Sequence, residues 1–162
     1  MAYESVHLEN SIAIENIISV HYFQYMSDFS FPGESHDFWE LVCVDRGEII
    51  AVAGDRQLAL KKGNILFHKP NEFHNVLTNG RISPSLVVIG FDCHSPCMKA
   101  FEDQLMNVQD TEKELLAKII VEARNTFDGR LDDPYQEKLV FLEKQASFGA
   151  PQLIRHYLEQ LM

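Results

Sequence analysis

The chain has 162 residues, 46% of them hydrophobic, which is enough for one compact domain with a buried core. Its 14 Lys and Arg residues against 24 Asp and Glu residues give a formal net charge of −10, so we expect this chain alone to repel nucleic acid. No apolar stretch approaches the roughly 20 residues that cross a bilayer, the start lacks a signal-peptide pattern and the three cysteines are an odd number, so we expect a cytoplasmic protein with no membrane partner.

Short β-rich runs alternate with turn residues through the first part of the chain. Gly54-Asp55, between two alternating apolar runs, is the clearest hairpin signal. Many short strands at this spacing, without helices between them, predict a sandwich or barrel. The predicted strands cover residues 17–25, 38–44, 48–53, 57–60, 65–67, 75–77 and 86–91.

Near residue 105 the apolar period changes from two residues to about 3.6. Thr111 and Glu114 have the spacing of a capping box, and the apolar stripe that follows predicts a helix over residues 111–127. We therefore expect a β-barrel at residues 1–104 and a helical segment, for dimerisation or linkage, at residues 105–162.

Two prolines mark further helices in that segment. Asp133 followed by Pro134 predicts a second helix that continues through Leu142, and Pro151 predicts a third that continues to Met162. The third helix carries a stripe of apolar side chains that needs a partner, either a second copy of the chain or another part of the same chain. The stripe comprises Leu153, Ile154, Tyr157, Leu158 and Leu161.

Two segments contain the histidine and glutamate residues that are the main candidates for a binding site. Residues 33–47 read Gly-Glu-Ser-His-Asp-Phe-Trp-Glu-Leu-Val-Cys-Val-Asp-Arg-Gly, and residues 63–74 read Gly-Asn-Ile-Leu-Phe-His-Lys-Pro-Asn-Glu-Phe-His. Their spacing resembles the two motifs of the cupin β-barrel. The amino-acid sequence of the first segment also resembles that of the amino-terminal sensor domain of AraC-type transcription regulators. From about residue 17 onward, the resemblance implies a mainly β fold: a cupin-like double-stranded β-helix, or jelly-roll barrel, followed by a carboxy-terminal helical segment.

The same resemblance implies a set of metal ligands. It aligns His36 and Glu40 in the first motif and His74 in the second with cupin ligands, and it places Glu34 where the family has its first histidine. Imidazole and carboxylate groups suit a divalent transition metal such as Zn, Ni, Fe or Mn. The glutamate in place of histidine departs from the usual pattern and argues against a metal.

Strand geometry imposes a condition on this site. Residues four apart on a straight strand lie ~13 Å from each other, at about 3.3 Å per residue, so His36 and Glu40 can share an ion only if the chain bends between them. The alternative is that His36 and His74 line a polar barrel mouth and hydrogen-bond a small ligand or each other.

Strand alternation also divides the first motif into two faces. It places one set on one face, His36, Phe38, Glu40 and Val42, and the other set on the opposite face, Asp37, Trp39, Leu41 and Cys43. Trp39, the only tryptophan, is either a stacking surface for a small ligand or ordinary packing between barrel and helices. Cys43, between two valines, is expected to be a buried, inert thiol.

The resemblance implies that the chain is the ligand-sensing and dimerisation part of an AraC-type regulator. Its expected ligand-binding residues are His36, Glu40, His74, Glu34 and Trp39, and its partners are a small-molecule effector and a second copy of the chain. DNA would be bound by a helix-turn-helix domain that these 162 residues lack, so we expect a regulatory half. The alternatives are a metal-dependent cupin enzyme, such as a small dioxygenase or isomerase, and a dimerising module with a vestigial pocket.

Overall fold

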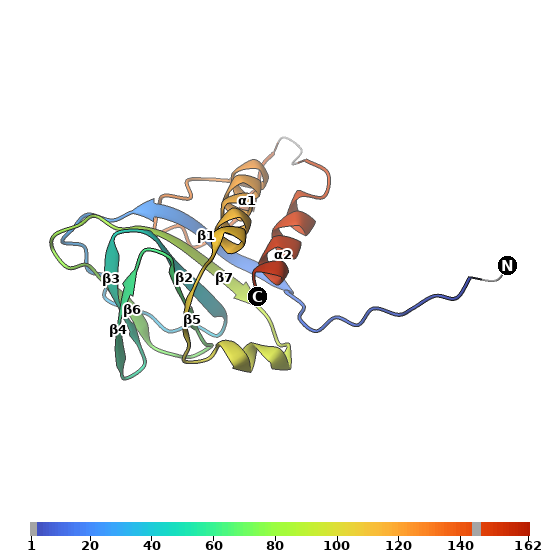
Figure 1. The fold of residues 1–162 in the computed structure, drawn as a ribbon. Coiled ribbons are helices and arrows are strands. Elements are labelled where there is room, and N and C mark those ends of the chain that lie inside the picture. The colour runs from blue at the N-terminus through green and yellow to red at the C-terminus, as the bar shows by residue number, and fades with distance from the viewer. Residues whose placement is uncertain (1–2, 144–146) are drawn as a thin grey trace.

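The computed structural model describes residues 3–143 and 147–162. Antiparallel sheets of five and three strands lie face to face, two helices cover the outer face of the larger sheet (Figure 1), and a third sheet has two short strands. The strands are β1 (Asn16–Gln24), β2 (Trp39–Arg46), β3 (Glu48–Ala53), β4 (Arg56–Lys61), β5 (Asn64–His68), β6 (His74–Leu77), β7 (Ser85–Asp92), β8 (Leu105–Asn107), β9 (Phe127–Asp128) and β10 (Val140–Phe141). The helices are α1 (Asp110–Thr126) and α2 (Ala150–Leu161), with a 3₁₀ helix η1 at Pro96–Phe101.

The larger sheet has the order β1-β7-β2-β5-β8 and the smaller one β4-β3-β6. All seven strands predicted from the sequence are present, within two residues at each end. The predicted mainly β barrel of jelly-roll type, followed by a carboxy-terminal helical segment, is therefore confirmed. Strands β8, β9 and β10 and helix η1 were not predicted, since elements of two to six residues are too short to show a period.

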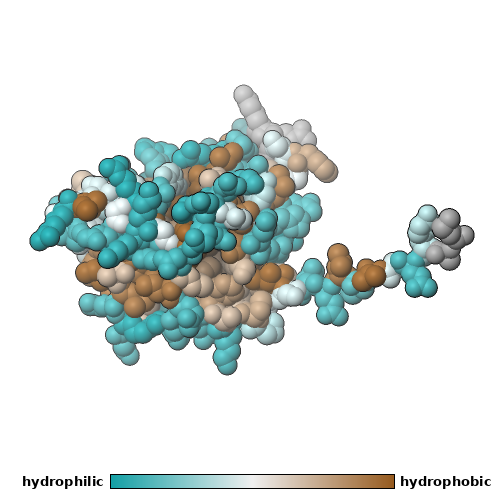
Figure 2. All heavy atoms as spheres, viewed as in Figure 1, coloured by the Kyte–Doolittle hydropathy of each residue, from teal (hydrophilic) through white to brown (hydrophobic). Residues whose placement is uncertain are grey.

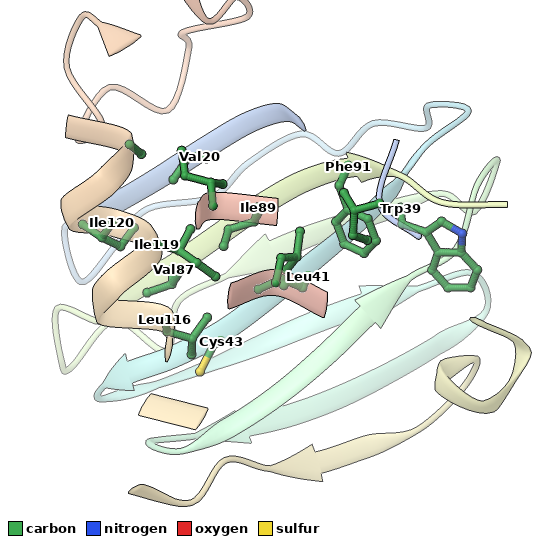
Figure 3. Packing of buried hydrophobic residues seen from close by; sticks show 14 of the residues in the cluster. Val20, Trp39, Leu41, Cys43, Val87, Ile89, Phe91, Leu116, Ile119 and Ile120 are labelled. Carbon is green, nitrogen blue, oxygen red and sulfur yellow. The ribbon is translucent and has the colours of Figure 1, made fainter. Parts of the chain in front are cut away.

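Strand β2 is buried on both faces because it lies between two layers of core. Val42 and Val44 point between the two sheets, where they pack with residues such as Leu60 and Leu86. The alternate residues of β2 point toward the helices and join a second cluster with α1 and α2, which Figure 3 shows from close by. The side chains of this cluster include Trp39, Leu41, Cys43, Ile89, Phe91, Ile119, Ile154 and Leu158.

Helix α1 begins one residue before the predicted start. The capping box is formed by Gln109 and Glu112 rather than by Thr111 and Glu114, and the backbone N–H of Gln109 donates to Oε2 of Glu112 at 2.7 Å. Glutamine is not among the residues usually preferred at an N-cap, so the sequence signal pointed to the nearby threonine. Helix α2 confirms the prediction at Pro151, which lies in its first turn.

The prediction of a helix that begins at Pro134 is wrong. The Asp133 side chain does accept a local hydrogen bond, from the N–H of Tyr135 at 3.0 Å, but a turn follows instead of a helix. Upstream, the carbonyl of Leu131 accepts the N–H of Tyr22 at 2.8 Å, which fastens this segment to β1. Downstream, Val140 and Phe141 form a short strand paired with β9. Tertiary pairing has thus replaced local helix formation.

The amino-terminal segment extends away from the body of the protein (Figures 1 and 2). Its Val6 and Leu8 side chains are exposed to solvent. None of the helices in the described ranges is both long enough and apolar enough to cross a membrane.

Candidate functional site

Four ligand-type side chains converge at one end of the barrel. Glu34 forms an isolated antiparallel bridge with His74, the first residue of β6. His36 lies just before the bend at residues 37–38, and Glu40 follows that bend as the second residue of β2. One ligand atom from each of these four residues lies within 4.8 Å of the others. The bend that a shared site required is thus present.

Backbone carbonyls orient both histidine rings. Nδ1 of His36 lies 3.0 Å from the carbonyl oxygen of Phe38, and Nδ1 of His74 lies 2.9 Å from that of Glu72. A carbonyl can only accept, so each Nδ1 carries a hydrogen, and the neutral ring presents the lone pair of Nε2 to the cluster. Both Nε2 atoms are buried without a hydrogen-bond partner in the described part of the chain. Metal-binding histidines are commonly oriented in this way.

The separations between the ligand atoms fit a divalent ion. Nε2 of His36 is 3.7 Å from Glu40, and Nε2 of His74 is 3.5 Å from Glu40 and 3.8 Å from Glu34. Around a tetrahedral ion with bonds of ~2.1 Å, ligand atoms lie about 3.4 Å apart. The three separations that involve a histidine exceed this value by at most about 0.4 Å, but the four ligand atoms together spread over as much as 4.8 Å, so the side chains would have to move closer to bind one ion. Two imidazoles and two carboxylates would suit Zn, Ni, Fe or Mn.

The charges in the cluster move the pKa values of its members in different directions. Burial alone would lower the pKa of His36, but its interaction with Glu40 outweighs burial and raises that pKa. Burial lowers the pKa of His74, and the charge of Glu40 offsets this only in part. For Glu40, burial would raise the pKa, but the three surrounding histidines outweigh it and lower the pKa. Glu40 is therefore the buried anion to which a cation would be drawn.

The cluster forms one end of a pocket with a volume of about 330 Å³. Its walls include four aromatic side chains, Phe23, Tyr25, Phe31 and Phe38. The buried Nδ1 of His21 and Oδ1 of Asn75, which also line it, have no hydrogen-bond partner among the described residues. With the two Nε2 atoms of the cluster, this pocket holds four unsatisfied polar atoms. Buried polar groups usually have partners, so such a concentration points to a ligand or ordered water.

The pocket is not built by the barrel alone. Pro134, Gln136 and Glu137, from the segment between α1 and α2, form part of its wall. The hydrogen bond from Tyr22 to Leu131 fixes the start of this segment on β1. A molecule in the pocket would therefore touch both the barrel and the connection between the two helices.

Trp39 does not belong to this pocket. It is 6% exposed and packs in the cluster on the helix side of the sheet, opposite to Glu40 (Figure 3). Strand alternation separated the two faces correctly but did not say which face would line the pocket. Of the two alternatives for Trp39, the geometry matches core packing.

Two histidines near the site were not predicted from the sequence. His68 is fully buried, stacks on His74 with 4.4 Å between ring centroids, and lies opposite Glu40 in the register of β2 and β5. It occurs in the second motif, six residues before His74, but a turn separates β5 from β6, so alternation along one strand could not assign it to the site. His21 lies on β1, where no motif marks it, and only the packing of β1 beside β7 brings it to the pocket.

Similar sequences occur in transcription activators. A stretch of 45 residues, 28% of this chain, is 40% identical to the HTH-type transcriptional activator RhaS of Pectobacterium carotovorum subsp. carotovorum, and equally to RhaS of Pectobacterium atrosepticum. The match covers 16% of each activator, so the chain spans only a small part of these relatives.

Two solved cupin structures are similar to part of the chain. The cupin domain of Schizosaccharomyces pombe Cnp3 matches 50% of this chain and 59% of its own, with a TM-score of 0.45 and 12% identity. A cupin superfamily protein of Desulfitobacterium hafniense matches 54% of this chain and 84% of its own, with a TM-score of 0.44 and 15% identity.

A family model described as the AraC-like ligand binding domain matches residues 16–80. The matched range begins with β1 and ends after β6. It contains the four residues of the cluster, Glu34, His36, Glu40 and His74. Residues 16–80 of this chain are thus similar to an AraC-like ligand-binding domain.

Proposed function

We propose that the chain is the ligand-sensing and dimerisation part of an AraC-type transcription regulator. It binds a small molecule in the pocket that contains Glu34, His36, Glu40 and His74. The observation that carries this proposal is a set of four polar atoms in one pocket, all from the matched residues 16–80, that have no hydrogen-bond partner among the described residues. Contacts with DNA come from a helix-turn-helix domain outside these 162 residues.

The signal travels by a shift between two arrangements of barrel and helices. A ligand that contacts Gln136 and Glu137 together with the barrel binds more tightly to the arrangement in which these walls are closed. Since this segment joins α1 to α2, the preference biases the position of both helices. Binding is the activity, and no reaction is required.

The proposal includes a homodimer and a cytoplasmic location, where a regulator reaches DNA. Most of the predicted apolar stripe of α2 does not supply the dimer surface, because Ile154 and Leu158 are buried against the protein's own core. Leu153 of the stripe is exposed, and four other large hydrophobic side chains between α1 and α2 are exposed as well: Tyr135, Val140, Phe141 and Phe148. Exposed apolar side chains of this kind support an interface that involves them. Sedimentation as a monomer at micromolar concentration would remove the dimer from the proposal.

The sensing function is tested by screening small molecules for a rise in melting temperature. A true effector stabilises the wild type and does so much less in His36→Ala, because the variant loses one wall of the pocket. Lys138→Ala, outside the pocket, is the matched control. If every hit stabilises both variants equally, the pocket is not the sensing site.

The four-residue cluster specifically favours a second candidate, a metal-dependent cupin enzyme. When bound, a divalent ion would act as a Lewis acid, held by His36, His74, Glu40 and Glu34. Elemental analysis of protein purified without a nickel column, followed by titration with Zn, Ni, Fe and Mn, tests this candidate. The absence of saturable binding by any of them would eliminate the enzyme.

A further inference from the structure

We propose a second small-molecule site, for a carboxylate with an apolar body, in a groove between α1 and the larger sheet. We call it the α1 groove. Its floor consists of Cys43, Val87, Val108, Leu116 and Ile120, all of them buried. Figure 3 shows Cys43 and Leu116 approaching each other from the sheet and the helix. The site is distinct from the barrel pocket, because Cys43 and Glu40 lie on opposite faces of β2.

The floor of the groove is suited to an apolar body. The groove has a volume of about 270 Å³. This is room for roughly nine water-sized groups at ~30 Å³ each. Burial first, and then the charge of Asp45, raise the pKa of Cys43 to about 12, so the thiol stays neutral and acts as an apolar wall. A straight-chain acid of about eight carbons matches this space.

The rim supplies the charge complement. Lys62, Lys113 and Arg124 line the groove together with a single acid, Asp45, although acids outnumber bases in the chain by 24 to 14. Asp45 is itself engaged, since its Oδ2 accepts the hydroxyl of Tyr22 at 2.8 Å.

The cations of the rim are available to a ligand. Lys113 contacts Asp110 at 3.1 Å, but that carboxylate is 98% exposed, and such surface pairs are weak. Across the described ranges, Lys62 and Arg124 form no ion pair. An incoming carboxylate can therefore pair with the rim without displacing a strong interaction.

The same charges argue against a second copy of the chain as the occupant. A twofold interface brings the same patch of both copies together, so the three cations of one rim would face those of the other. A small anion neutralises the rim instead. By touching Leu116 and Ile120 on one side and Cys43 and Val87 on the other, it would tie α1 to the sheet.

The test uses octanoate as the probe and 1-octanol as its uncharged match, both titrated into the wild-type chain by ligand-observed NMR. Octanoate should bind saturably, and octanol at least tenfold more weakly. Lys113→Gln combined with Arg124→Gln should weaken octanoate at least tenfold, whereas Lys99→Gln combined with Lys138→Gln should not. Ala117→Trp, at an exposed position of α1 that lines the groove, should occlude it without disturbing the core.

His74→Ala separates this site from the barrel pocket, because octanoate binding should survive that substitution. Octanoate binding that persists in Ala117→Trp, or that disappears in His74→Ala, would place the acid elsewhere and overturn the proposal. So would the absence of saturable binding up to millimolar octanoate. Each of these results leaves the effector screen of the barrel pocket unaffected.

Discussion

The rings of His36 and His74 meet nearly edge to face, with 4.7 Å between their centroids and an interplanar angle of 68°. Their Nε2 atoms face the two carboxylate oxygens of Glu40, at 3.7 and 3.5 Å. Because backbone carbonyls fix the other nitrogen of each ring, neither ring can turn away from Glu40 without losing a hydrogen bond. The site is thus organised before any ion or ligand arrives.

Replacing His74 by alanine should weaken the binding of a divalent metal by at least tenfold. The substitution removes one of two nitrogen ligands, and even the loss of an outer-shell partner typically costs 10–100-fold. Titration of Zn or Ni, followed by calorimetry, measures the effect. The control is His94→Ala, since His94 is exposed and pairs with Glu15 on the surface. Equal metal affinity in the two variants would show that His74 is not a ligand.

Acid should destabilise the protein in part through His21. Burial lowers the pKa of His21 below 6.5 in the folded state. Between that lowered pKa and 6.5, the unfolded chain binds more protons, so stability is present above pH 6.5 and is lost as the pH falls through this window. One such proton contributes at most about 1.4 kcal/mol per pH unit.

The variant His21→Gln should accordingly show a smaller loss of melting temperature between pH 7.5 and pH 5 than the wild type. His7→Gln, in the exposed amino-terminal segment, should behave as the wild type does. An equal loss of melting temperature between pH 7.5 and pH 5 in all three proteins would contradict the role assigned to His21.

Asn75→Val should stabilise the ligand-free protein and weaken the binding of its effector. The Oδ1 atom of Asn75 is buried without a hydrogen-bond partner in the described chain, and leaving such a group unsatisfied costs about 1–3 kcal/mol. Valine removes that cost and suits its place on β6 opposite Val52. Urea unfolding should show a gain of about 1 kcal/mol. A loss of stability would mean that ordered water already satisfies Oδ1.

The strands could be predicted because local and tertiary preferences agree there. Alternating apolar residues between turn signals, as around Gly54, leave few other ways to bury the chain, and β3 begins and ends at the predicted residues. At Pro134 the two preferences conflict. Its local sequence resembles a helix start, but the bond between Tyr22 and Leu131 depends on a partner more than a hundred residues away. A local sequence pattern cannot predict a hydrogen bond to such a distant partner.

The residues of the candidate site likewise divide into those that a local pattern predicts and those that only tertiary pairing places. Glu34, His36, Glu40 and His74 were found because their spacing along the chain resembles a motif, and the structure brings them together. His68 and His21 reach the same region through strand pairing and packing, which spacing along one segment does not encode.

Leu158→Glu should lower the melting temperature strongly rather than release folded monomers. Leu158 is fully buried in the core between the sheet, α1 and α2, so the charge would have no partner. An uncompensated buried charge costs about 3–5 kcal/mol. At roughly 2–4 °C per kcal/mol, the expected decrease is about 6–20 °C. Should this variant fail to fold, Leu158→Ala, with a cost of about 2–5 kcal/mol, gives the same answer.

The matched control is Leu153→Glu on the same helix, where the side chain is 37% exposed. It should change the melting temperature by little, because the charge can reach water. If Leu153 belongs to the proposed dimer surface, this variant should instead shift sedimentation toward the monomer. A folded monomer with an unchanged melting temperature from Leu158→Glu would reverse these assignments and return the buried stripe of α2 to the dimer interface.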